Sequence, residues 1–310
     1  IRRLYVHNYR CFENFDLVLK GEASHLLLGK NGSGKSTVGL ALELFQSIGR
    51  GTGRVSDLVK PRDFVNGRTT APMRFEIEVE LDKKIFVYSI AFELPPKFRE
   101  LRIIDEKLLV DGCIVFSREL AEVRIANGAA FGIDWHIVAL PIVQDRPTHR
   151  EISLFKNWIR NILILRPVPS LFQSVTDGDV YDLPVINPRE IDVGPWFTEM
   201  VTSAPESYSI ISEYLKDVMP DFSRITNEPL IRNCRDLTFH FDKNDQDLSL
   251  SIDQLSDGER IFFLYSLVIA ASIVRYPLFC FWDEPDNFLA PAEVGQSIMA
   301  LRRAFKKGGQ

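Results

Sequence analysis

Nine residues near the start of the chain have the types and spacing of a phosphate-binding loop. Residues 29–37 read GKNGSGKST and match the pattern G-x-x-x-x-G-K-[ST]. Glycines let the backbone turn tightly, so that several N–H groups converge on a phosphate at a helix N-terminus. In this pattern Lys35 reaches the β- and γ-phosphates, and the hydroxyl of Ser36 binds Mg²⁺. The residues predicted to bind nucleotide here are Gly29, Lys30, Asn31, Gly32, Ser33, Gly34, Lys35, Ser36 and Thr37.

Two carboxylates near the other end of the chain suit phosphoryl transfer. The apolar run Leu278–Trp282 predicts a strand, and Asp283-Glu284-Pro285 follows it. Such a strand end matches a Walker B motif, in which Asp283 binds Mg²⁺ through water and Glu284 orients and polarises the attacking water. We therefore predict Lys35 and Glu284 as catalytic residues, Ser36 and Asp283 as metal ligands, and ATP with Mg²⁺ as cofactors. The alternative is a pair of surface acids.

A second candidate anion site stands before the apolar helix predicted over Ile261–Val274. Residues 255–260 read LSDGER. A serine hydroxyl, a permissive glycine and free N–H groups at a helix N-terminus can hold a phosphate. Taken alone, this segment is equally well explained as a helix cap. The residues predicted to contact nucleotide are Ser256, Asp257, Gly258 and Glu259.

The elements that must position these groups alternate between strand and helix patterns. An apolar run predicts a strand at His25–Leu28 before the loop, and helical spacing predicts a helix from Thr37 to Gly49 after it. Alternation of apolar residues with glutamates predicts a strand over Met73–Leu81. Further strands are predicted at Leu4–Asn8, Phe15–Leu19 and Ile85–Leu94, hairpins at Lys107–Phe116 and at Leu237–Phe241 with Leu248–Ile252, and helices at Glu151–Arg160 and Pro205–Met219.

Composition excludes several classes of protein. The 310 residues are 45% hydrophobic and 25% charged, with a net charge of −5, as in a soluble chain that buries a large core. The four cysteines are far apart and show no metal-ligand spacing, which favours a reduced, cytoplasmic protein. The longest apolar run, Ile261–Val274, is too short to span a membrane, and the charged residues that open the chain lead us to expect no signal peptide.

One local run of positive charge lies between Arg50 and Arg68. It is the best candidate for contact with DNA or RNA phosphates, although charged loops are more often simply solvated. Its basic residues are Arg50, Arg54, Lys60, Arg62 and Arg68, set against Asp57 and Asp63.

Together these segments resemble the ATPase heads of the ABC-type SMC/RecF/OLD group. The resemblance rests on Ile1–Leu19 before the P-loop, on SDGE as a form of the ABC signature, and on Walker B followed by DNFLAP. It implies an α/β P-loop NTPase, with an ABC-ATPase-like head, an antiparallel β lobe and a compact mixed α/β insertion. Residues 1–60 and 235–310 would form the core and 61–234 the β lobe and helical insertion, with a C-terminal remainder, including a switch histidine, beyond this chain.

The same resemblance assigns roles to individual residues. Arg10 would lie near the nucleotide, with a solvated turn arginine as the alternative. The signature would bind the γ-phosphate held by another subunit's P-loop, so a head-to-head homodimer around two nucleotides is expected. Ala290 departs from the group's pattern, where histidine is common, and this weakens the expectation of communication across the dimer there.

Within this group, the chain looks most like PtuA-type ATPases of Septu and retron anti-phage systems. That likeness implies a separate nuclease or effector as partner. The lack of sustained heptads speaks against a long coiled-coil arm. Alternatives are an OLD-type nuclease, a RecF-like DNA-repair ATPase, and a scaffold that binds ATP without hydrolysing it. A P-loop kinase is disfavoured, because it would need neither the signature nor this segment after Walker B.

Overall fold

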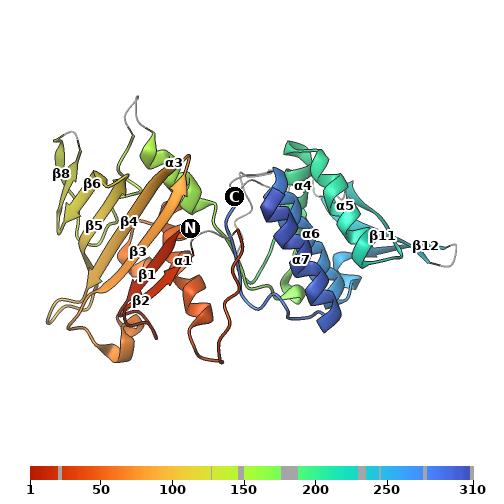
Figure 1. Ribbon diagram of the computed structural model, residues 1–310, viewed down its shortest axis with the longest axis horizontal. Helices are drawn as coiled ribbons and strands as arrows, with labels where there is room; N and C mark the ends of the chain where they lie inside the picture. The colour runs from red at the N-terminus through yellow and green to blue at the C-terminus, as the bar shows by residue number, and fades with distance from the viewer. Residues whose placement is uncertain are drawn as a thin grey trace. The chain divides into compact units, whose positions relative to one another are not determined.

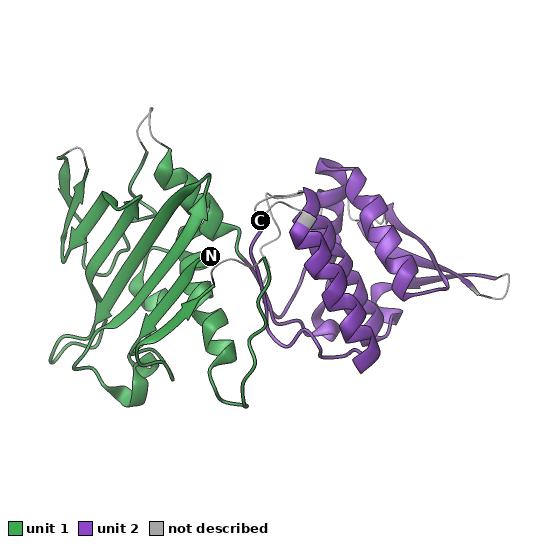
Figure 2. Ribbon diagram, viewed as in Figure 1, with its two compact units in different colours: residues 1–162 green, residues 163–310 purple. Residues whose placement is uncertain are grey.

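The computed structural model describes residues 1–19, 23–126, 128–145, 150–175, 188–229, 235–243, 246–274 and 278–307. The chain divides into two compact units, Ile1–Ile162 and Leu163–Gln310 (Figure 2). This division differs from the discontinuous core that the resemblance to ABC-type heads implies, and the joining of residues 1–60 with 235–310 stays a prediction. The P-loop belongs to the first unit, and the signature and Walker B segments belong to the second.

The first unit is built on an eight-stranded antiparallel sheet with the order β2-β1-β3-β4-β5-β6-β7-β8 (Figure 1). Its strands are β1 Arg3–His7, β2 Phe15–Val18, β3 Met73–Leu81, β4 Lys84–Glu93, β5 Arg102–Val110, β6 Cys113–Glu119, β7 Glu122–Ile125 and β8 Ala130–Gly132. Its helices are α1 Lys35–Gly49, α2 Val55–Leu58 and α3 Glu151–Arg160, with 3₁₀ turns η1 Pro61–Asp63 and η2 Val65–Gly67.

Side-chain alternation decides which face of this sheet is buried. On β3 the apolar residues, such as Phe75, are buried, while the glutamates between them are more exposed. Helices α1 and α3 cover the apolar face, where Phe75 packs edge-on against Phe45 of α1, and Phe86 of β4 stacks on Phe155 of α3. The predicted strands at the start of the chain, β3, β4, the hairpin at Asp111-Gly112 and helix α3 are confirmed.

The strand predicted at His25–Leu28 is wrong. These residues form no strand, and the side chains of Leu26 and Leu28 are 69% and 84% exposed. A strand needs a hydrogen-bonded partner, and β2 is the last strand at this edge of the sheet in the described part of the first unit. The helix after the loop also begins earlier than predicted, at Lys35 rather than Thr37.

A buried charged network fastens the loop before α3 to the sheet. Glu106 of β5 accepts hydrogen bonds from the Tyr88 hydroxyl and from the N–H groups of Ala139 and Leu140. The guanidinium of Arg118 lies 3.6 Å from this carboxylate and donates to backbone carbonyls, including that of Asp134. Because burial favours the neutral acid, the pKa of Glu106 is raised.

The second unit packs helices around one buried helix. Its elements are β9 Leu163–Leu165, η3 Pro169–Leu171, α4 Val193–Ser203, α5 Glu206–Val218, β10 Phe222–Pro229, β11 Arg235–Lys243, β12 Gln246–Ser251, η4 Ile252–Gln254, α6 Asp257–Val274, β13 Cys280–Trp282 and α7 Pro291–Lys307. Residues 261–272 of α6 are all buried, as expected for a helix that is apolar all round. Helices α4, α5 and α7 pack against α6, and Phe239 of β11 meets Phe263 edge-on at 5.0 Å.

The strands of this unit form two separate sheets. Strands β10, β11 and β12 make an antiparallel sheet, and β9 and β13 pair in parallel. Helix α5 and the β11–β12 hairpin are as predicted, whereas α4 was not predicted. No helix in the described ranges combines the length and apolarity needed to cross a membrane.

Candidate nucleotide site

The P-loop forms a tight turn whose backbone depends on glycine. Gly32 and Gly34 adopt positive φ angles of 79° and 99°, which favour glycine over residues with a Cβ atom. The Nζ atom of Lys35 donates hydrogen bonds to the carbonyls of Gly29 at 2.8 Å and Lys30 at 3.2 Å. The loop therefore curls around the ammonium group, and helix α1 begins at that same lysine.

The turn between β1 and β2 packs directly against this loop. A Cβ atom on Gly34 would lie 2.5 Å from the ring of Phe12 and 2.9 Å from the sulfur of Cys11. The Cys11 sulfur also lies 3.5 Å from the hydroxyl oxygen of Thr37. Gly34 is thus required both for its backbone angle and for the space that its missing side chain leaves.

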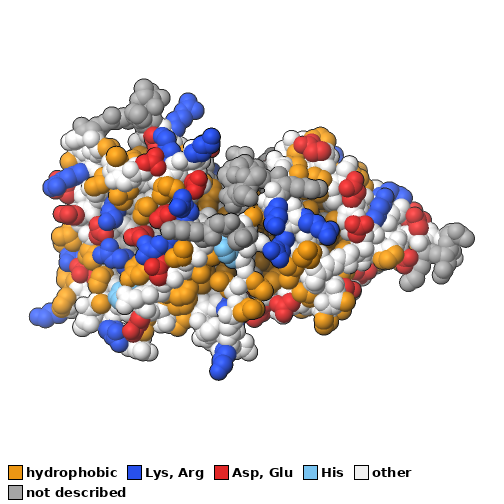
Figure 3. Space-filling model, in the orientation of Figure 1, with side chains coloured by type: hydrophobic (Ala, Val, Ile, Leu, Met, Phe, Trp, Pro, Cys, Tyr) orange, Lys and Arg blue, Asp and Glu red, His pale blue; other side chains and the backbone are white. Residues whose placement is uncertain are grey.

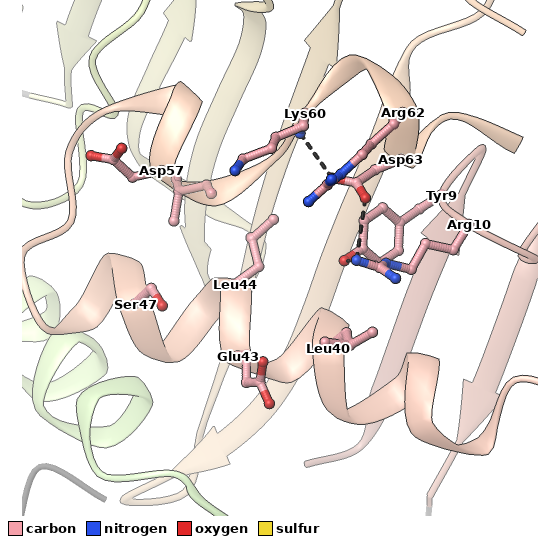
Figure 4. Close-up of a pocket in the computed structure, with 11 residues that line it drawn as sticks. Tyr9, Arg10, Leu40, Glu43, Leu44, Ser47, Asp57, Lys60, Arg62 and Asp63 are labelled. Carbon is pink, nitrogen blue, oxygen red and sulfur yellow. Dashed lines mark hydrogen bonds and ion pairs between the residues drawn. The ribbon is translucent and has the colours of Figure 1, made fainter. Parts of the chain in front are cut away.

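Arg10 belongs to the same turn and lines a pocket of about 200 Å³ beside α1 (Figure 4). Its guanidinium pairs with Asp63 at 3.2 Å and donates to the Tyr9 hydroxyl at 3.2 Å. The pocket is also lined by Leu40, Glu43, Leu44 and Ser47 of α1 and by Asp57, Leu58, Lys60 and Arg62. Arg10 precedes Cys11, whose sulfur touches the P-loop. Contact of Arg10 itself with nucleotide stays a prediction.

The basic run between Arg50 and Arg68 is partly neutralised. Arg68 pairs with Glu13 at 3.1 Å, and Lys60 and Arg62 line the pocket that also contains Asp57 and Asp63. Burial, aided by repulsion from Arg160, lowers the pKa of Arg50. On the face of the first unit seen in Figure 3, acidic and basic side chains are interspersed. Contact with nucleic acid stays a prediction that these pairings do not favour.

The Walker B carboxylates follow the parallel pair β9–β13. Strand β13 is two residues shorter than predicted, and the Asp283 N–H donates to the carbonyl of Leu165 at 2.8 Å, which extends the pairing beyond the strand. The Asp283 side chain is 11% exposed, and its Oδ2 atom lies 3.6 Å from Nε of Arg166. This aspartate is therefore held at a strand end beside a positive charge.

Glu284 has a backbone conformation that few glutamates adopt. Its φ is +53°, in the left-handed region. The side-chain Nδ2 of Asn287 donates to Oε2 of Glu284 at 2.7 Å. The backbone N–H of Asn287 donates to the backbone carbonyl of Glu284 at 3.2 Å. This tight turn places a hydrogen-bond donor on the carboxylate that is predicted to act on water.

The signature segment forms the start of α6. The Ser256 N–H and hydroxyl both donate to the Glu259 carboxylate at 2.7 Å, and the Glu259 N–H donates to the Ser256 hydroxyl at 3.3 Å. This is a capping box, so the helix-cap alternative is confirmed as a structural role. A Cβ atom on Gly258 would lie 3.3 Å from the carbonyl of Phe288, which places the signature against the segment after Walker B. Binding of phosphate by this segment stays a prediction.

The donor atoms predicted for Mg²⁺ suit that ion. Ser36 supplies a hydroxyl and Asp283 a carboxylate, and Mg²⁺ prefers such oxygen ligands together with phosphate and water. Within the ranges that the structure describes, no cluster of three or more His, Cys, Asp or Glu residues could hold a metal.

Two residues beside this chemistry were missed by sequence reasoning. Arg166 is 117 positions from Asp283 and meets it only because β9 and β13 are paired. Phe12 reaches Gly34 from the β1–β2 turn. A signal for Arg166 was present in the short apolar run Ile162–Leu165, which has the length of a buried strand and ends at an arginine.

Comparisons with known proteins agree with the fold and with part of the chemistry. Residues 1–151 match the model of a family described as an AAA ATPase domain. No curated protein sequence matches the chain. A solved structure described as the SmcHead bound to the C-winged helix domain of ScpA aligns with 99% of this chain and 87% of its own, with a TM-score of 0.57 and 16% identity. The chain thus has an α/β, P-loop NTPase fold similar to that of the SMC head, and residues 1–151 match an AAA ATPase domain.

Proposed function

We propose that the protein is a Mg²⁺-dependent ATPase in which the P-loop and the Walker B carboxylates act on the same ATP molecule. The observation that supports this most strongly is the P-loop itself. Its glycines hold positive φ angles, its lysine lies within hydrogen-bond distance of two loop carbonyls, and a helix begins at that lysine. A glycine-rich turn that served only to connect elements would need none of these features together.

Each residue then has a defined task. The loop N–H groups and Lys35 bind the β- and γ-phosphates, and Ser36 and Asp283 hold the hydrated metal. Bound Mg²⁺ supplies positive charge that neutralises the phosphate oxygens as charge develops. Glu284 orients the attacking water and accepts its proton, while Asn287 keeps that carboxylate pointed in one direction.

We further propose that the signature segment binds the nucleotide of a second copy, giving a head-to-head dimer. Ser256 precedes a helix of 18 residues, and the exposed side chain of Phe288 belongs to the segment that lies against Gly258. An aromatic residue with 48% exposure, beside a helix end that we propose binds phosphate, suits an interface that forms only with nucleotide. Ser256→Arg should leave ATP binding intact and block ATP-dependent association in sedimentation experiments.

For its biological role, we propose control of a partner nuclease or effector in anti-phage defence, in the manner of PtuA-type ATPases. The longest described helix has 18 residues, which suits a compact head rather than the root of a long coiled-coil arm. The SMC head in the similar structure is bound to a separate protein, the C-winged helix domain of ScpA, so a protein partner is compatible with this fold. The role is tested by phage challenge of two kinds of cell, one with the wild-type gene and its neighbouring genes and one with the same genes carrying Lys35→Ala. Equal protection from phage in the two would count against the role.

Two substitutions test the enzymatic part. Lys35→Ala should abolish or strongly weaken ATP binding measured by calorimetry, because it removes the cation that the loop surrounds. Glu284→Gln should keep binding and lower single-turnover hydrolysis by roughly 10²- to 10⁴-fold, the usual loss when a general base is removed. Equal hydrolysis by wild type and Glu284→Gln would leave ATP as a structural ligand of a scaffold.

A further inference from the structure

The ion pair between Arg166 and Asp283 has no role in the mechanism described so far. Arg166 follows β9 directly and Asp283 follows β13 directly, and these strands pair in parallel with Leu165 opposite Trp282. The next residue along each strand is therefore brought to the same edge of the two-stranded sheet. The pair arises from the strand register and not from the flexible ends of two surface side chains.

Both side chains of this pair are largely removed from solvent. Arg166 is 18% exposed and Asp283 is 11% exposed. Backbone hydrogen bonds fix both partners, because the Asp283 N–H donates to the Leu165 carbonyl and the Arg166 N–H donates to the Pro188 carbonyl at 2.7 Å. Charges screened so little from each other interact more strongly than an exposed pair does.

We propose that Arg166 is a positioning residue for Asp283, holding the carboxylate in one direction so that it can act on the Mg²⁺ that a bound nucleotide would bring. This inference rests on the proposed function. The separation of 3.6 Å between Nε and Oδ2 is an ion-pair distance that lies beyond a normal hydrogen bond. The guanidinium therefore orients the carboxylate electrostatically. Groups that orient a metal-binding carboxylate from behind typically contribute 10- to 100-fold to metal affinity.

The charge of Arg166 can also act in the opposite direction, by repelling Mg²⁺. A positive charge so close to Asp283 could simply repel a divalent cation, in which case its removal would tighten Mg²⁺ binding. Orientation predicts the reverse, because a carboxylate released from Arg166 samples several directions and only some of them face the metal. The sign of the change in Mg²⁺ dependence separates the two effects.

The experiment measures the affinity for a slowly hydrolysed ATP analogue by calorimetry across a Mg²⁺ series and in EDTA. For Arg166→Gln we expect unchanged affinity in EDTA and a 10- to 100-fold rise in the Mg²⁺ concentration at half effect. Arg166→Lys, which keeps the charge and loses the planar fork, should fall between wild type and Arg166→Gln. Arg303→Gln, at an exposed position on α7 in the same unit, is the matched control and should match the wild type.

A double-variant comparison shows whether Arg166 acts through Asp283. In an Asp283→Asn background the Arg166→Gln substitution should produce no further change, since the partner carboxylate is already gone. An equal effect in both backgrounds, unchanged Mg²⁺ dependence, or tighter Mg²⁺ binding in Arg166→Gln would each overturn the proposal. If Arg166→Gln lowers the unfolding temperature strongly, the comparison is made with Arg166→Lys. Failure of the wild type to bind the analogue at all would instead overturn the proposed ATPase function.

Discussion

The substitution Gly34→Ala tests whether the β1–β2 turn and the P-loop form one packed unit. Gly34 has φ of +99°, and a methyl group there would approach the Phe12 ring to 2.5 Å and the Cys11 sulfur to 2.9 Å. Gly32, two residues earlier, has φ of +79°, and no atom lies within 4 Å of the position that a methyl group would take there. Gly32→Ala therefore shares the backbone strain of Gly34→Ala without its steric clash.

The expected free energies follow from these two contributions. Forcing an alanine into a left-handed conformation costs about 1–2 kcal/mol. Overpacking against an aromatic ring that is already buried adds about 1–3 kcal/mol. Gly34→Ala should therefore destabilise the first unit by about 2–5 kcal/mol, and Gly32→Ala by about 1–2 kcal/mol. At about 2–4 °C per kcal/mol for a unit of this size, the two variants should differ in unfolding temperature by about 2–12 °C.

The assay is thermal and urea unfolding of each variant without nucleotide, so that lost ATP binding does not enter the comparison. A second substitution, Phe12→Leu, removes the ring that the new methyl group would meet. In that background the additional loss caused by Gly34→Ala should shrink, whereas the loss caused by Gly32→Ala should stay the same. Equal losses for the two glycine variants in the wild-type background would refute the packing argument.

Three further predictions concern other contacts. Asn287→Ala should slow single-turnover hydrolysis by about 10²-fold with unchanged ATP affinity, because it frees the Glu284 carboxylate, and it should add nothing in a Glu284→Gln background. Arg118→Met should lower the unfolding free energy by about 3–5 kcal/mol in urea titrations, since the buried Glu106 carboxylate loses its cation, and Glu106→Gln in the same chain should restore part of it. Burial raises the pKa of Tyr214 to about 12, so the folded state keeps the phenol proton and its stability is lost as pH rises from 10 towards 12. At pH 7 Tyr214→Phe should be about 1 kcal/mol less stable than wild type, because it lacks the hydrogen bond to Ser297. Between pH 10 and 12 its unfolding free energy should fall less than that of the wild type, and equal falls in the two proteins would contradict this.

The sequence alone determined the parts of this protein whose cause is local. Strand β3 alternates apolar and glutamate residues, and the hairpin turn at Asp111-Gly112 uses two residues that adopt positive φ. The glycines of the P-loop supply the positive φ angles of its tight turn, and Ser256 with Glu259 is a cap defined by a spacing of three residues. In each case neighbours along the chain supply the interacting groups, so spacing and residue type are sufficient evidence.

Only the tertiary structure decided the features that depend on residues far apart. The run at His25–Leu28 has a strand's composition but no strand partner, because pairing is decided by what lies beside a segment and not by its own residues. Arg118 and Glu106 form a buried pair through the pairing of β5 with β6, and Arg166 reaches Asp283 through the register of β9 against β13. In another register Arg166 and Asp283 would not be brought together. Asp283 could therefore be predicted from its motif, whereas its pairing with Arg166 is visible only in the fold.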